Sequence, residues 1–125
     1  MTFTEKRQKI MSAMENSGIL TKNISYKKDD IPREFPAAIV TLNGEKGIKP
    51  TSKRFVEFDY DIAIFLIIDV NKSSDPDADI LDLTNTFKEQ YRAAIGNDIP
   101  KIDYYPARAD SGRKVRIAKV YTVAE

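Results

Sequence analysis

The chain has 125 residues, of which 42% are hydrophobic, and its 20 lysine and arginine residues nearly balance 19 aspartate and glutamate residues. This length and composition predict one globular domain over residues 1–125. The sequence has no cysteine or histidine, which excludes a disulfide framework, a thiol nucleophile, a conventional zinc site and a Ser-His-Asp arrangement. We therefore expect a protein that is not an enzyme and holds no cofactor.

The N-terminal segment MTFTEKRQKIMSAM predicts an amphipathic helix rather than a secretory signal, because it is charged and lacks an apolar core. Thr2 or Thr4 can cap this helix and Gly18 can end it. Its apolar side chains recur on one side: Phe3, Ile10, Met11 and Met14. Nowhere does an apolar run approach the ~18 residues of a membrane span, so we expect no membrane partner.

Extended segments follow the helix. A short strand is predicted near Ile24, and Pro32 and Pro36 interrupt the link after it. Residues 37–44, AAIVTLNG, predict a second strand that ends on Asn-Gly. Residues 45–54, EKGIKPTSKR, are polar and contain glycine and proline. We expect them to form a long surface loop that is mobile or functional.

The longest predicted strand, RFVEFDYDIAIFLIIDV, covers residues 54–70 and changes character along its length. Residues 56–61 alternate apolar and acidic side chains, whereas residues 62–68 are apolar on both faces. The pattern indicates a strand with one polar face over residues 56–61 and with both faces buried over residues 62–68. We expect it to pair antiparallel with residues 37–43.

The second helix is predicted over residues 75–95, with Asp75 as N-cap, Pro76 in the first turn and Gly96 as stop. Residues 101–108, KIDYYPAR, and 115–123 predict two closing strands. This order predicts an α+β fold, a mostly antiparallel sheet of about four or five strands with two helices packed on one face. The helices should cover residues 62–68 and pack through Ile80, Leu83, Phe87 and Tyr91.

Two motifs resemble ligand-binding sites but lack the residues that such sites require at fixed positions. The segment DPDAD, residues 75–79, lacks the glycine and glutamate that a calcium-binding EF-hand loop needs at its sixth and twelfth positions. Helix capping explains its aspartates, so we expect no metal site. The segment NGEKG, residues 43–47, lacks the phosphate-loop spacing and precedes no helix, which leaves a hairpin turn as its interpretation.

Charge is segregated along the chain. Residues 1–54 hold 11 basic and 6 acidic residues, residues 55–99 hold 3 basic and 10 acidic, and residues 100–125 hold 6 basic and 3 acidic. This pattern indicates partners rather than a fold. It predicts a candidate interface with an acidic strand face, a basic loop and a basic hairpin: Glu57, Asp59, Asp61; Lys46, Lys49, Lys53, Arg54; Arg108, Arg113, Lys114, Arg116.

The basic hairpin permits two interpretations. With Tyr104 and Tyr105 nearby, its cations could serve a small nucleic-acid-binding module. The near-neutral domain argues against tight DNA binding, since nucleic-acid readers usually carry a larger basic excess. A basic hairpin that meets an acidic neighbour fits equally well. The carboxylate row itself is best interpreted as a face exposed to solvent or to a basic partner.

The whole layout resembles the tail terminator, or tail-completion, proteins of long-tailed bacteriophages and related prophage particles. The resemblance rests on order and texture: an N-terminal amphipathic helix, FPAAIV at residues 35–40, FDYDIAIFLIIDV, an acidic turn, and the helix DILDLTNTFKEQYRAAI before two closing strands. It implies a ring, commonly a hexamer, that caps the tail tube, stops its polymerisation and meets the head-to-tail connector. It also implies no catalysis and no cofactor.

On this resemblance the expected partners are other copies of the chain, the tail tube protein and the connector, in the host cytoplasm during assembly and then in the virion tail. The acidic strand face would either meet a basic surface of the next subunit or line the central hole. Alternatives are a head-closure or connector protein of the same particle, or the nucleic-acid-binding module.

Overall fold

A computed structural model describes residues 2–27, 32–48, 57–109 and 112–122, with side chains over all of these except 45–48 and 57–60. The α+β prediction is confirmed: two helices accompany a five-stranded sheet of order β1-β2-β3-β5-β4. Every neighbouring pair is antiparallel except β1 and β2. The elements are α1 Phe3–Asn16, β1 Ile24–Ser25, β2 Ala37–Ile48, β3 Glu57–Asp69, α2 Pro76–Ile95, β4 Lys101–Arg108 and β5 Lys114–Tyr121, with 3-10 turns at Thr21–Asn23 and Val70–Lys72. No helix in the described part of the chain is long and apolar enough to cross a membrane.

Both helices begin and end where the sequence supplies the capping chemistry. The Thr2 hydroxyl accepts a hydrogen bond from the Glu5 amide at the start of α1, and Asp75 does the same for the Ala78 amide at the start of α2. At the end of α2, Gly96 takes a φ of 92°, in the left-handed region that side chains disfavour. The predicted ends of α2 are thus confirmed.

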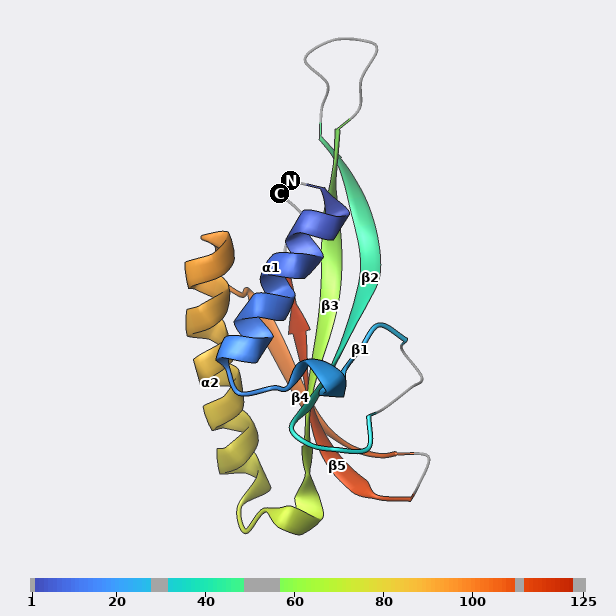
Figure 1. The fold of residues 1–125 in the computed structure, drawn as a ribbon, viewed down its shortest axis with the longest axis vertical. Coiled ribbons are helices and arrows are strands. Elements are labelled where there is room, and N and C mark those ends of the chain that lie inside the picture. Colours follow the sequence, from blue (N-terminus) through green and yellow to red (C-terminus); the bar gives the residue numbers. More distant parts are fainter. Residues whose placement is uncertain (1, 28–31, 49–56, 110–111, 123–125) are drawn as a thin grey trace.

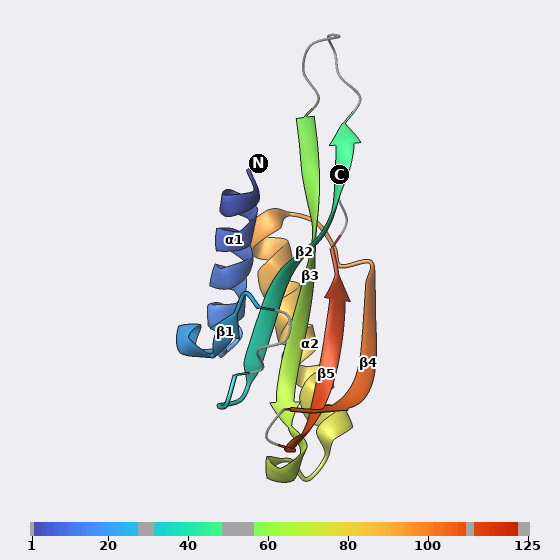
Figure 2. The same ribbon diagram turned by 90° about the vertical axis from the view of Figure 1, so that its right-hand side faces the viewer.

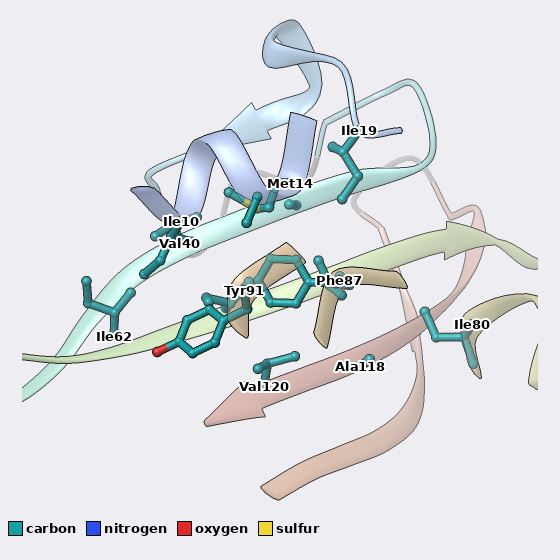
Figure 3. Close-up of a cluster of buried hydrophobic side chains, with 14 residues drawn as sticks. Ile10, Met14, Ile19, Val40, Ile62, Ile80, Phe87, Tyr91, Ala118 and Val120 are labelled. Carbon is teal, nitrogen blue, oxygen red and sulfur yellow. The ribbon is translucent and has the colours of Figure 1, made fainter. Parts of the chain in front are cut away.

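The main core lies between the helices and one face of the sheet (Figures 1 and 3). Phe87 and Tyr91 of α2 are 0% and 2% exposed, and their ring centroids lie 6.0 Å apart. They form one cluster with side chains of α1 and with alternate residues of the three central strands, β2, β3 and β5. Other fully buried members labelled in Figure 3 include Ile10, Met14, Ile62, Ala118 and Val120.

The opposite sheet face carries a second, smaller cluster, and no helix of the described residues covers it (Figures 1 and 2). Ile67 is fully buried there and Ile117 is nearly so. Phe35 packs against this cluster from the segment that precedes β2, and Phe65 and Tyr105 pack from the strands themselves. Residues 62–68 are therefore apolar on both faces because both faces of β3 are covered at that level.

The change of character along β3 follows its neighbours in the sheet. Residues 63–67 lie between β2 and β5, whereas residues 57–61 pair with residues 44–48 of β2 alone. This two-stranded part, which we call the ribbon, projects beyond the sheet and both helices (Figures 1 and 2). The predicted loop of residues 45–54 was therefore wrong over 45–48, which continue β2 past an irregularity at residues 42–44; residues 49–54 lie outside the described residues.

Candidate assembly surfaces

The ribbon carries the predicted acidic strand segment. Its register pairs Lys46 with Asp59 and Gly44 with Asp61, so a basic and an acidic candidate lie on neighbouring strands of the same chain. This qualifies the prediction that the 45–54 segment meets the acidic strand of another subunit, because Lys46 already has an acidic neighbour. The candidates Lys49, Lys53 and Arg54 lie outside the described residues.

Asp61 lies at the base of the ribbon. Its Oδ2 accepts a hydrogen bond of 3.2 Å from the Asn43 side-chain amide. Its Oδ1 is buried and has no hydrogen-bond partner in the described part of the chain. A half-satisfied carboxylate at this position is costly for an isolated subunit.

The predicted basic hairpin, at the β4–β5 turn, lies at the end of the molecule opposite the ribbon (Figures 1 and 2). Two of its four cations have acidic partners within the chain. The Arg113 guanidinium lies 3.6 Å from the buried Asp69 carboxylate and donates a hydrogen bond of 3.2 Å to the Arg33 carbonyl. Arg116 forms an ion pair with Asp77 at the start of α2.

Charge is consequently less segregated in space than along the sequence. The acidic first turn of α2 lies at the same end of the molecule as the basic hairpin (Figure 1). Acidic and basic side chains are also in direct contact there, since Arg113 and Arg116 form ion pairs with aspartates. The remaining candidates, Arg108 and Lys114, are exposed and pair with each other in the strand register. They form no ion pair with the described residues.

The two tyrosines that the nucleic-acid hypothesis grouped together lie on opposite faces of β4. The Tyr104 hydroxyl lies 3.0 Å from the Thr84 hydroxyl of α2, on the helix side. Tyr105 packs in the smaller cluster of the other face, and burial raises the pKa of its phenol, with smaller opposing influence from Lys119. They therefore cannot form one stacking platform with the basic hairpin.

The helix-free face, which we call the open face, carries a cluster that sequence reasoning missed. Here Lys119 Nζ lies 4.8 Å from the Tyr121 ring centroid and 5.7 Å from that of Phe65. Lys101 Nζ lies 5.2 Å from the Tyr121 centroid and 3.6 Å from the Asp103 carboxylate. The alternation of residues 117–121 could have shown which side chains share a face, but only the strand order brings β3, β4 and β5 together.

Both sides of the sheet have strand edges without a described neighbour. On one side β4 is the last strand, and on the other β1 covers β2 only at Ala38 and Ile39. Large exposed side chains lie along these edges: Tyr104 of β4 is 42% exposed and Leu42 of β2 is 50% exposed. Edges of this kind are available for pairing with another chain.

The described residues contain no group of three or more aspartate, glutamate, histidine or cysteine residues that could hold a metal ion. No protein-family model matches the sequence, and no curated protein matches it. The assignment of function thus rests on the surfaces described above.

Proposed function

We propose that this protein is the tail terminator of a long-tailed bacteriophage or related prophage particle. It forms a ring, of six subunits, that caps the tail tube, stops its polymerisation and presents a surface for head joining. Its partners are other copies of itself, the tail tube protein and the head-to-tail connector. The protein would act in the host cytoplasm during assembly and remain in the virion tail.

The observation that carries this proposal is the ribbon of β2 and β3. A two-stranded ribbon is marginal by itself in water, and this one projects past the core that stabilises the rest of the chain. Its outer backbone groups have no strand partner among the described residues. An arm of this kind supplies contact area to a neighbour while contributing little to the stability of its own subunit.

The two ends and two sides of the molecule also differ from each other. The ribbon lies at one end and the cations Arg108 and Lys114 at the other, while β2 and β4 offer unlike edges. Unlike surfaces on one subunit support head-to-tail contacts, which close into rings or continue as filaments. A head-closure or connector protein would use the same geometry and is the nearest alternative.

A nucleic-acid-binding module is the second candidate, and the open face favours it. Phe65, Tyr121 and Lys119 combine aromatic rings with a cation, as in single-strand-binding sheets. However, Lys101 is paired with Asp103 on that face, and the lysines already lie over the rings. Among the described residues, Lys119 is then the one lysine of the cluster without a carboxylate partner, which is a small charge for holding a phosphate backbone.

The test is removal of the protein from the particle that encodes it. We expect tubes of uncontrolled length that lack heads, because nothing stops polymerisation or joins the connector. Purified protein added to headless tubes should restore joining, and electron microscopy should show a ring at one tube end. Normal finished tails after deletion would refute a terminator role. Finished tails that fail only at head joining would favour the head-closure alternative.

A further inference from the structure

A groove of about 420 Å³ lies on the surface at the end of the β4–β5 hairpin. It is lined by three cationic residues, Arg108, Lys114 and Arg116, and by an apolar floor that includes Val70 and Pro106. The charge pattern of the sequence predicted that the cations are close together. The apolar floor and the shared groove are properties of the folded chain alone.

The strand register explains why these three cations meet. Arg108 pairs with Lys114, and Pro106 pairs with Arg116, so the three side chains occupy one face of the hairpin. The next residue in this series, Ala118, lies in the core under the helices. The groove therefore opens on the helix side, beyond the start of α2. Arg113 lies out of this series, and its guanidinium is over the Phe35 ring on the open face.

Positive charge in the groove is incompletely neutralised. Arg116 binds Asp77 through one guanidinium nitrogen, while its Nε is buried with no hydrogen-bond partner in the described part of the chain. Arg108 and Lys114 lie directly opposite each other on adjacent strands, an arrangement of like charges that destabilises a sheet. An anion in the groove would relieve this repulsion and could accept a hydrogen bond from the unpaired donor.

We propose that this groove receives the acidic strand segment, residues 57–61, of a second copy of the chain. The proposal rests on the ring function above and names one of its contacts. Within EFDYD every second residue is a carboxylate, so the carboxylates recur about 7 Å apart along one side of a strand. Cations on two adjacent strands can engage such a row. The apolar floor excludes water and strengthens the ion pairs relative to fully exposed ones.

The positions of the two surfaces make the contact intermolecular. The ribbon and the hairpin lie at opposite ends of the molecule in both views, so a chain cannot place its own acidic segment in its own groove (Figures 1 and 2). Each copy offers one ribbon and one groove. The contact is therefore heterologous and generates a ring or a filament.

The test is a charge reversal with a rescue. The double variant Arg108→Glu with Lys114→Glu should weaken self-association at least about thirtyfold, because carboxylates of the groove would then repel the carboxylates of the acidic strand segment. A matched control, Lys9→Glu with Lys88→Glu, makes the same change of net charge at exposed positions of the two helices and should associate like the parent. Circular dichroism and melting temperature establish that each variant is folded, and native mass is measured over a range of concentrations and with tail tubes present.

The rescue identifies the occupant. Adding Glu57→Lys and Asp59→Lys to the groove variant places two cations opposite its two new carboxylates, so association and tail completion should recover. A folded groove variant that associates like the parent would overturn this contact while leaving a ring intact. Failure of the rescue after loss with the groove variant would exclude the acidic segment as occupant. A parent that neither associates nor completes tails would refute the ring function itself.

Discussion

At the scale of single residues, stability rests on the side chains that α2 inserts between α1 and the sheet. Phe87 is fully buried and lies in the centre of the main cluster (Figure 3). Helical spacing predicted Ile80, Phe87 and Tyr91, and their burial is confirmed. Leu83 is only partly buried. Thr84 is fully buried, and its polar hydroxyl is satisfied there because it donates a hydrogen bond to the Leu81 carbonyl and lies beside the Tyr104 hydroxyl.

Truncation of Phe87 to alanine should lower the free energy of unfolding by about 3–5 kcal/mol, because it removes a ring from a closed core and leaves a cavity. Urea unfolding followed by circular dichroism measures the loss. Lys88→Ala, at the next and exposed position, should change stability by less than about 0.5 kcal/mol. A loss below ~1 kcal/mol for Phe87→Ala would contradict its place in the core.

Tyr105 should make stability depend on alkaline pH. Burial raises the pKa of its phenol above the ordinary value of 10.0, so the folded state favours the neutral form. This contribution is present below pH 10 and is lost as pH rises through the folded pKa, since the unfolded chain ionises first. Urea unfolding between pH 9 and about 11.5 should show a steeper decline for the parent than for Tyr105→Phe. Parallel declines would show that this phenol is not the cause.

At the scale of elements, β3 serves both a core and an arm. Its residues 63–67 have a strand on each side and helices over one face, while its residues 57–61 have β2 alone. The two functions can therefore be separated by changing the arm. The pairs from Ala37–Ile67 to Leu42–Ile62 stay in the body of the sheet.

Replacement of residues 45–60 by an Asn-Gly turn should leave the fold intact, because this turn closes two-residue hairpins and the core pairs remain. We expect a melting temperature within a few degrees of the parent and loss of tail completion. Scanning calorimetry and the tube-joining assay check the two outcomes. A shortened protein that completes tails would show that the ribbon is not an assembly arm.

At the scale of the whole molecule, we expect the charge distribution to suit contact with protein better than contact with duplex DNA. The basic hairpin is partly neutralised by Asp69 and Asp77, and residues 55–99 are acidic overall. The net charge of the chain is only +1. A nearly neutral chain exerts little of the long-range attraction that drives non-specific binding.

Duplex DNA should accordingly bind no more tightly than micromolar at physiological salt. Fluorescence anisotropy with a labelled duplex of about 20 base pairs checks this. The groove variant Arg108→Glu with Lys114→Glu serves as a control, because any weak binding through the hairpin should vanish with it. Sub-micromolar binding that falls steeply with added salt would instead support the nucleic-acid-binding module.

Local chemistry was enough to predict several elements directly from the order of residues. Capping residues and 3.6-residue spacing specified α2 from Asp75 to Gly96, and alternation identified β4 and β5. The absence of cysteine and histidine excluded whole classes of site. These features depend on neighbours along the chain, so no knowledge of the fold is required to find them.

Which strands are neighbours and which sheet faces are covered became known from the folded chain alone. Residues 45–48 looked like a loop because glycine and lysine disfavour strands, yet pairing with β3 extends β2 through them. Tyr104 and Tyr105 are adjacent in sequence but separated by the sheet, and Lys119 meets Phe65 only because β5 lies beside β3. The groove of Arg108, Lys114 and Arg116 likewise depends on a cross-strand register, and register is set by contacts between distant segments rather than by local pattern.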